Sequence, residues 1–222
     1  MLPPDEYTMW LERAITGKNV EELDKAYQDL VQKVKRIDPL TIAEQTDSSY
    51  RSDGVPRIEV PFLHSWFELD LLPYRVRAGH EVIDTLPLKV LMLHHLVTAA
   101  ENQGTAVRVM GKWIDCRSLQ FGAFLGAHFA KSTTEAMDRF FSFPDEERMV
   151  RALKWGGKPL NLGDEGFLFH LFPRLPVALI NWKADEEFPS YSKILYDVSA
   201  SNYMPTHGLA ALTDFLLHRL AE

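Results

Sequence analysis

The 222-residue sequence contains a single cysteine, Cys116, and this scarcity restricts its chemistry. One thiol cannot form an intramolecular disulfide, and it cannot supply the several cysteines that an iron–sulfur cluster needs. Any such cluster would have to belong to a partner protein. The chain needs neither device to fold, because a chain of this length buries roughly 70–75% of its unfolded surface.

Long apolar runs and positive charge are also scarce. No stretch approaches the roughly 20 apolar residues that span a bilayer, and the first residues lack the basic and apolar regions of a secretory signal. The 24 Lys and Arg residues are outnumbered by 31 Asp and Glu, which gives a net charge of −7. Because nucleic-acid binding depends on neutralising phosphates, we expect neither nucleic acid nor a membrane as partner. The sequence predicts a cytoplasmic protein.

The motifs of well-known enzyme classes are missing. The eight histidines form no HExxH pair, no serine lies in a Gly-x-Ser-x-Gly elbow, and no Gly-x-Gly-x-x-Gly opens a helix. The segment Gly156-Gly157-Lys158-Pro159 resembles a phosphate loop, but it lacks the first glycine and the final Ser or Thr of that motif. The sequence therefore leaves open whether the protein is an enzyme.

Local periodicity divides the chain into parts. Residues 1–37 have helical spacing, and residues 57–77 alternate between apolar and polar side chains, as short strands do. Residues 87–155 are again helical, and residues 166–222 form strands and a C-terminal helix. Because strands and helices do not alternate regularly, the pattern indicates a single α+β domain over residues 1–222. We expect a mostly antiparallel sheet from the N-terminal meander and the C-terminal strands, packed with about six to seven helices.

Several local predictions are specific. The polar stretch 43–56 is predicted to be a loop, and residues 5–16 a helix. The helix over residues 87–101 is apolar almost all round and should therefore be central. Ser132 is followed three residues later by Glu135, which is the spacing of a capping box, so a helix is predicted to begin there.

Two acidic segments are candidates for a metal or proton-transfer site. The run Asp185-Glu186-Glu187 brings three carboxylates together, which can bind a hard cation or raise one another's pKa. Asp164 lies just before a predicted strand that contains His170. If these segments met, the metal ligands would be Asp164, His170, Asp185 and Glu187. The alternative is that both acidic segments are solvated turns flanked by glycine and proline.

Aromatic residues are abundant, with 5 Trp, 7 Tyr and 13 Phe. Such a set, which includes Trp113 and Trp182, could line a cavity for a large flat ligand such as a tetrapyrrole. The alternative is a plain aromatic core.

His95 and Cys116 also have two interpretations each. His95 is either a metal ligand or a hydrogen-bonded core histidine, and Cys116 is either a nucleophile activated by Arg117 or an inert packed thiol.

A series of short segments follows in a defined order along the chain. The most specific is Phe172-Pro173-Arg174-Leu175-Pro176, which is followed by Trp182 and by Asp185-Glu186-Glu187-Phe188-Pro189. The other landmarks are residues 37–43, 111–114, 156–159, 163–164, 194–197 and 203–205. In this order the segments resemble an uncharacterised prokaryotic family, the domain of unknown function DUF3786, over most of the chain.

The resemblance implies a protein of anaerobic metabolism, without assigning a reaction. Some family members resemble fusions with a cysteine-rich iron–sulfur segment, of the kind found in corrinoid proteins, and this chain departs from them because it has no such segment. An iron–sulfur or corrinoid protein is therefore a candidate partner. Arg174, between two prolines, presents a rigid guanidinium that suits a carboxylate, either Asp185 or Glu187 or that of an anionic ligand.

These observations favour a binding or accessory protein that holds a small molecule or cofactor, with a corrinoid or another tetrapyrrole as the candidate. Two alternatives stay open. One is a metal-assisted or carboxylate-dependent hydrolase or lyase, and the other is a protein–protein adaptor without a ligand. The residues predicted to bind the ligand are Trp113, Arg174, Trp182, Asp185, Glu186 and Glu187.

Overall fold

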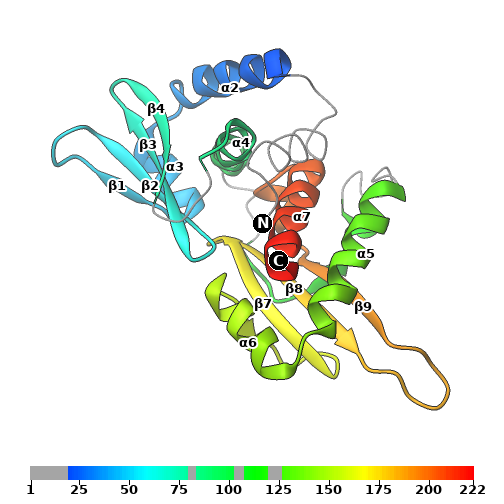
Figure 1. The fold of residues 1–222 in the computed structure, drawn as a ribbon. Helices are drawn as coiled ribbons and strands as arrows, with labels where there is room; N and C mark the ends of the chain where they lie inside the picture. The colour runs from blue at the N-terminus through cyan, green and yellow to red at the C-terminus, as the bar shows by residue number, and fades with distance from the viewer. Residues whose placement is uncertain (1–19, 80–83, 103–107, 120–126) are drawn as a thin grey trace.

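The computed structural model describes residues 20–79, 84–102, 108–119 and 127–222, and in these ranges the chain forms two antiparallel sheets and six helices (Figure 1). The predicted α+β class is confirmed. The strands divide into two sheets, however, where the sequence predicted one. Strands of the N-terminal meander pair only with their sequence neighbours, and the C-terminal strands form the second sheet.

The first sheet is a four-stranded meander in the order β1-β2-β3-β4. Its register follows the alternation of apolar and polar residues. In β3 the side chains of Phe67 and Leu69 are buried, whereas Trp66 between the turn and Phe67 is exposed. One face of the sheet therefore lies on the core and the other faces solvent. The strands are β1 (Ser49–Arg51), β2 (Arg57–Phe62), β3 (Ser65–Leu71) and β4 (Tyr74–Ala78).

The second sheet has five antiparallel strands in the order β5-β9-β8-β7-β6. Its central strand β8 is buried at every position except Trp182, because protein covers both of its faces. A strand of this kind reads as a continuous apolar run, which is why its sequence shows no alternation. The strands are β5 (Trp113–Asp115), β6 (Lys158–Pro159), β7 (Glu165–Phe172), β8 (Leu175–Trp182) and β9 (Tyr191–Asp197).

The helices surround these sheets, with α4 in the middle. Helix α4 packs against α2, α3 and α7, and its burial on most sides confirms the prediction of a central helix. Helix α5 lies beside α7 (Figure 1). None of the described helices is long and apolar enough to cross a membrane. The helices are α2 (Val20–Val34), α3 (Pro39–Thr46), α4 (Leu86–Glu101), α5 (Ala127–Ser142), α6 (Asp145–Lys154) and α7 (Thr206–Ala221).

The two sheets meet at the turn between β2 and β3. The backbone N–H of Leu63 donates to the carbonyl oxygen of Leu171 in β7 at 3.2 Å. Next to this contact, the ring of Phe62 lies 5.2 Å from Phe67 and 5.3 Å from Phe172, between ring centroids. One hydrophobic cluster therefore includes side chains from both sheets and from the helices that pack on them.

Two local predictions are corrected. The stretch 43–56, predicted to be a loop, contains the end of α3 and all of β1. Helix α3 begins where the Asp38 side chain accepts a hydrogen bond from the backbone N–H of Thr41, with proline at the first helical position. Ser132 does not open a helix, because α5 already begins at Ala127. The predicted helix over residues 5–16 lies outside the described residues.

Candidate functional site

The predicted ligand-binding residues lie at both ends of the second sheet. Arg174 is in the turn between β7 and β8, where its guanidinium donates to the carbonyl oxygen of Gln45 at 3.1 Å. Trp182 is at the far end of β8, about 23 Å along the strand. The proposed pairing of Arg174 with Asp185 or Glu187 is therefore wrong, because β8 separates them. Arg174 instead holds the last turn of α3 against the second sheet.

The acidic run Asp185-Glu186-Glu187 lies in the exposed loop between β8 and β9. One carboxylate oxygen of Asp185 accepts hydrogen bonds from the backbone N–H groups of Glu187 (2.8 Å) and Phe188 (2.7 Å). Both bonds lower the pKa of Asp185, and the bond from Phe188 has the larger effect. The Asp185 side chain thus stabilises its own turn, which agrees with the solvated-turn interpretation.

The four proposed metal ligands are not gathered at one point. Asp164 accepts a hydrogen bond from the backbone N–H of Lys183 at 2.8 Å, which joins the start of β7 to the end of β8. His170 is about 17 Å further along β7, where burial and the charge of Lys158 lower its pKa. Within the described ranges no three His, Cys, Asp or Glu side chains are close enough together to hold a metal ion.

The two tryptophans of the predicted set are also apart. Trp182 stacks on Tyr191, with ring centroids 4.6 Å apart and planes at 7°. Trp113, on the edge strand β5, pairs with Asp197 at the other end of β9. The Trp182–Tyr191 stack therefore stiffens the stem of the β8–β9 hairpin, and Trp113 does not take part in it.

Most of the large aromatic side chains pack against one another. Phe172 and Phe215 are fully buried, and Phe172 stacks on His95 at 4.1 Å between ring centroids. The Nδ1 atom of His95 lies 3.0 Å from the carbonyl oxygen of Tyr203, which confirms the core-histidine interpretation. The described aromatic residues favour the plain aromatic core over an aromatic-lined cavity.

Cys116 follows β5 and is half-buried. Burial, which has the largest effect, and the carboxylate of Asp115, 3.5 Å from the sulfur, together raise the pKa of its thiol to about 11. The nearby Arg117 opposes this effect and does not overcome it. These contacts favour the inert-thiol interpretation over the activated nucleophile.

We expect iodoacetamide to alkylate native Cys116 at pH 8 about 100-fold more slowly than an ordinary cysteine, because the thiolate fraction falls tenfold per pKa unit. The rate can be followed by mass spectrometry. The same protein unfolded in urea is the control and should react at the ordinary rate. Equal rates in the native and unfolded states would contradict the inert thiol, and a faster rate in the native state would show that the thiol is activated.

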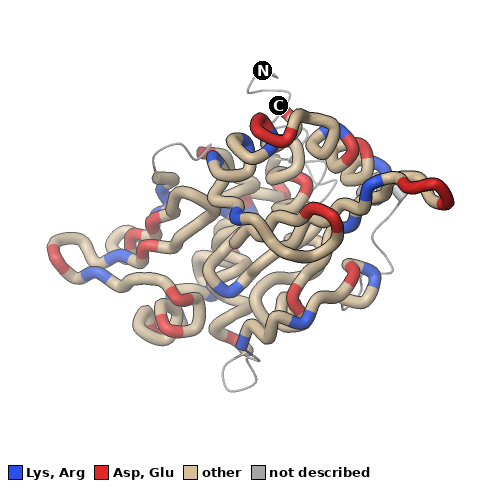
Figure 2. Tube along the Cα trace, turned by 90° about the horizontal axis from the view of Figure 1, so that it is seen from below, with Lys and Arg blue, Asp and Glu red and all other residues tan. Residues whose placement is uncertain are grey.

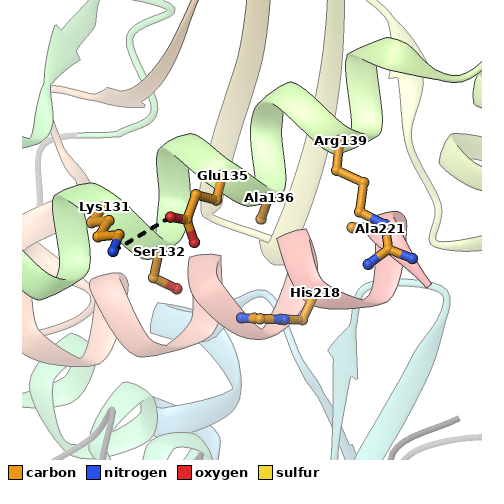
Figure 3. Close-up of a pocket in the computed structure, with 7 residues that line it drawn as sticks. All are labelled: Lys131, Ser132, Glu135, Ala136, Arg139, His218 and Ala221. Atoms are coloured by element: carbon orange, nitrogen blue, oxygen red, sulfur yellow. Dashed lines mark ion pairs between the residues drawn. The ribbon is translucent and has the colours of Figure 1, made fainter.

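A cavity of about 380 Å³ lies between α5 and α7 (Figure 3). Lys131, Glu135 and Arg139 follow one another at intervals of four residues, so they lie on one face of α5. The small side chains of Ala136 and Ala221 leave the space between the two helices open. The lining residues are Lys131, Ser132, Glu135, Ala136, Arg139, His218 and Ala221.

Two of the lining residues converge on a buried carboxylate. The hydroxyl of Ser132 donates to Asp214 at 2.8 Å, and Nε2 of His218 lies 3.8 Å from the same oxygen. Asp214 is only 4% exposed. A carboxylate this deep in a helix pair is costly unless it is hydrogen-bonded, and Ser132 meets part of that requirement from inside α5.

A second buried polar contact lies behind this one. The hydroxyl groups of Tyr196 in β9 and Thr213 in α7 are 2.7 Å apart. Burial raises the pKa of Tyr196, and the charge of Asp214 raises it further. Polar groups thus continue from the cavity wall into the packing of α7 on the second sheet. Buried polar groups next to an open cavity are typical of a ligand-binding site.

A further cavity, of about 410 Å³, lies where α2 ends near the end of α4. Its charged side chains, Arg36, Asp38 and Glu101, are all exposed. Asp38 is already used as the N-cap of α3, because it accepts hydrogen bonds from Thr41. The α5–α7 cavity is therefore the better candidate, since it alone of the two has a buried carboxylate behind its lining.

The sequence did not identify this site. Ser132 was interpreted as a helix cap, and His218 belonged to no motif. The only signal is the pair Thr213-Asp214 in a helix that is otherwise apolar on nearly every side. Polar residues at buried positions of such a helix indicate that a partner lies on a neighbouring element.

In Figure 2 the Lys and Arg positions are interspersed with Asp and Glu, and the described chain forms no continuous basic face in this view.

Comparison with known proteins gives one match. The sequence model of a family described as "Domain of unknown function (DUF3786)" matches residues 38–219. No curated protein matches the chain, and no solved structure does. The matched region includes the α5–α7 cavity, the turn with Arg174 and the acidic loop.

Proposed function

The chain belongs to the DUF3786 family, and we propose that it is an accessory protein that binds a small polar metabolite in the cavity between α5 and α7. One observation carries this proposal. Ser132 and His218 line the cavity from different helices, and both reach the buried carboxylate of Asp214. Helices that needed only to pack together would place apolar side chains here.

The arrangement supports binding better than nucleophilic catalysis. A catalytic serine needs a base that accepts its proton, most often a histidine whose orientation is set by a carboxylate. Here Ser132 and His218 both approach Asp214, so the carboxylate lies between them. Ser132 is hydrogen-bonded to Asp214 at 2.8 Å, whereas the 3.8 Å between His218 and the same oxygen is longer than a hydrogen bond. The metal-assisted or carboxylate-dependent hydrolase or lyase is also the weaker proposal, because the described structure does not gather the residues it would use, Asp164, His170, Asp185 and Glu187, at one point.

The size and lining of the cavity favour a small ligand. Its volume is about 380 Å³, at the lower end of the range of about 300–1,000 Å³ for small-molecule sites. Its lining includes charged and hydroxyl side chains but no large apolar or aromatic one, whereas the faces of a flat tetrapyrrole pack against such side chains. The tetrapyrrole expectation stays a separate prediction, tested by the absorption spectrum of anaerobically purified protein. An iron–sulfur or corrinoid protein partner is likewise a prediction, which rests on the family resemblance.

Native mass spectrometry of the anaerobically purified protein tests the proposal. We expect a small molecule bound in a one-to-one ratio. Ala136, which lines the cavity, is replaced with methionine to fill the space, and bound ligand should fall by about tenfold or more. The matched control is Asp138→Met, which places the same side chain on an exposed position of α5. Circular dichroism verifies that both variants are folded.

Three results would contradict this function. The wild type would carry no small molecule from any preparation and bind none from a metabolite extract. Alternatively, Ala136→Met and Asp138→Met would retain the same amount of ligand, which would place the ligand elsewhere. A stable complex with another protein that survives Ala136→Met, with no small molecule in it, would favour the adaptor alternative.

A further inference from the structure

We infer that the ligand of the α5–α7 cavity is a small organic anion whose carboxylate or phosphate oxygens are bound by the guanidinium of Arg139. This inference rests on the proposed function and deepens it by naming the chemical class of the ligand. The argument depends on what each charged side chain of the cavity already contacts.

Arg139 is the charged group of the lining whose side chain contacts no carboxylate in the described part of the chain. Figure 3 shows its guanidinium directed across the cavity toward the last turn of α7. Among the residues that the structure describes, Arg139 makes one hydrogen bond outside the helix ladder, in which its backbone carbonyl accepts from the Ser142 hydroxyl at 2.8 Å. Five N–H donors therefore face the cavity or solvent.

Two neighbouring arginines, unlike Arg139, already form ion pairs with carboxylates. Arg148 and Arg151 in α6 both donate to carboxylates, Arg148 to Glu165 and Arg151 to Glu147, each at 2.7 Å. A guanidinium matches the two oxygens of a carboxylate or phosphate with two parallel hydrogen bonds. Of these three arginines, Arg139 retains this capacity for a molecule from outside.

The charges of the cavity are separated between its two ends. Lys131 and Glu135 form an ion pair at 3.8 Å, and both are more than two-thirds exposed. Their charges cancel, so Arg139 is the positive charge at its end of the cavity, and the carboxylate of Asp214 lies behind the other end. An anion is attracted to this end of the cavity, whereas a cation would be repelled by Arg139 and find Glu135 already paired.

The other end of the cavity suits a polar group rather than a second charge. The Ser132 oxygen donates its proton to Asp214 and still has lone pairs that accept a hydrogen bond. A second carboxylate there would approach Asp214 and be repelled. A hydroxyl or amino group would donate to Ser132, while the small side chains of Ala136 and Ala221 leave room for a short carbon chain between the two ends.

The test uses inorganic phosphate, lactate and glycerol as probes, with binding measured by isothermal titration calorimetry on the full chain freed of co-purified ligand. Lactate carries a carboxylate and a hydroxyl, phosphate carries the anion alone, and glycerol carries hydroxyls alone. We expect lactate or phosphate to bind and glycerol not to bind. Arg139→Gln should weaken anion binding by about tenfold or more, and Arg139→Lys by less, since lysine keeps the charge and loses the two parallel bonds.

The matched control is Arg75→Gln, which removes an exposed guanidinium from β4, in the other sheet. It should leave anion binding unchanged. Arg139 is itself exposed, so its variants should fold as the wild type does. If phosphate binds more tightly than lactate, the natural ligand is a phosphate ester. If lactate binds more tightly, the natural ligand is a hydroxy acid or a similar carboxylate.

Two outcomes overturn the inference. In the first, Arg139→Gln binds the anions as well as the wild type and Arg75→Gln do, so Arg139 is not the anion site. In the second, the co-purified molecule is lost in Ala136→Met but is neutral or cationic. That second result would leave the proposed function standing and remove only the ligand class, whereas retention of the molecule in Ala136→Met contradicts both.

Discussion

Replacing Arg148 with methionine is expected to lower the free energy of unfolding by about 3–5 kcal/mol. Arg148 is only 3% exposed. Its guanidinium donates to Glu165 at 2.7 Å, to the carbonyl oxygen of Phe141 at 3.1 Å, and also to Asp145 and the carbonyl of Phe143. It thereby joins α6 to the end of α5 and to β7.

The loss is large because the partners remain after the arginine is removed. Methionine fills part of the space but donates no hydrogen bond. The Glu165 carboxylate and two backbone carbonyls then lie next to an apolar side chain, and each unsatisfied buried group costs about 1–3 kcal/mol. The hydrogen bonds to Glu165 and Asp145 raise the pKa of Arg148, against the effect of its burial, so the guanidinium stays charged in the fold.

Urea unfolding followed by circular dichroism measures the effect. The matched control is Arg77→Met, which removes an arginine that donates to Asp70 at 2.7 Å but is 46% exposed. Arg77 also forms an ion pair with Glu68 at 2.8 Å, but solvent screens these exposed contacts, so their loss should cost less than the loss of the buried Arg148. If Arg148→Met and Arg77→Met lowered the free energy of unfolding equally, the buried contacts of Arg148 would not stabilise the fold more than exposed ones do.

Acidification from pH 7 to about 4 is expected to remove about 3 kcal/mol of stability through His95 alone. His95 is fully buried in α4. The Tyr203 carbonyl 3.0 Å from Nδ1 can only accept a hydrogen bond, so Nδ1 carries the proton and Nε2 is the atom that acid would protonate. Nε2 is buried without a hydrogen-bond partner.

The direction of the effect follows from the pKa. The pKa of His95 is lowered from 6.5 to about 4, mainly by burial and to a smaller extent by the charge of nearby Arg174, and the hydrogen bond with Tyr203 opposes this shift. Between these two pH values the unfolded chain binds a proton that the folded chain does not. Stability from His95 is therefore complete above about pH 6.5 and is lost as the pH falls toward 4.

The measurement is urea unfolding at several pH values, compared with His95→Gln, whose amide can still donate to the Tyr203 carbonyl. The difference between wild type and variant should shrink by about 3 kcal/mol from pH 7 to 4. The lowered pKa values of His170 and the carboxylates act equally in both proteins and cancel. His207→Gln, at an exposed position, is the control and should follow the wild type. A difference that does not change with pH would refute the role of His95.

Local features of the fold could be predicted because they depend on neighbours in sequence. The alternation in residues 57–77 predicted the meander, and the apolar periodicity of residues 87–101 predicted the central helix α4. Helix α3 and strand β1 were missed, because α3 is short and β1 buries little, so neither leaves a clear periodic pattern.

The candidate site could not be predicted for the opposite reason. Ser132 and Asp214 are 82 residues apart in sequence, and only the packing of α5 on α7 joins them. The spacing of Ser132 and Glu135 matches a local cap equally well, and that interpretation was wrong because α5 starts earlier. Arg174 was similarly assigned to the acidic loop, although a strand of eight residues keeps them apart.

The sequence by itself determined the α+β class, most strand and helix positions and the family of the chain, because periodicity and motif order are properties of the chain alone. Tertiary structure alone decided that the strands form two sheets, that Arg174 contacts α3, and that Ser132, Asp214 and His218 meet beside a cavity. These features depend on which distant segments pack together. That choice minimises exposed apolar surface and unsatisfied polar groups over the whole molecule, and no single segment records it.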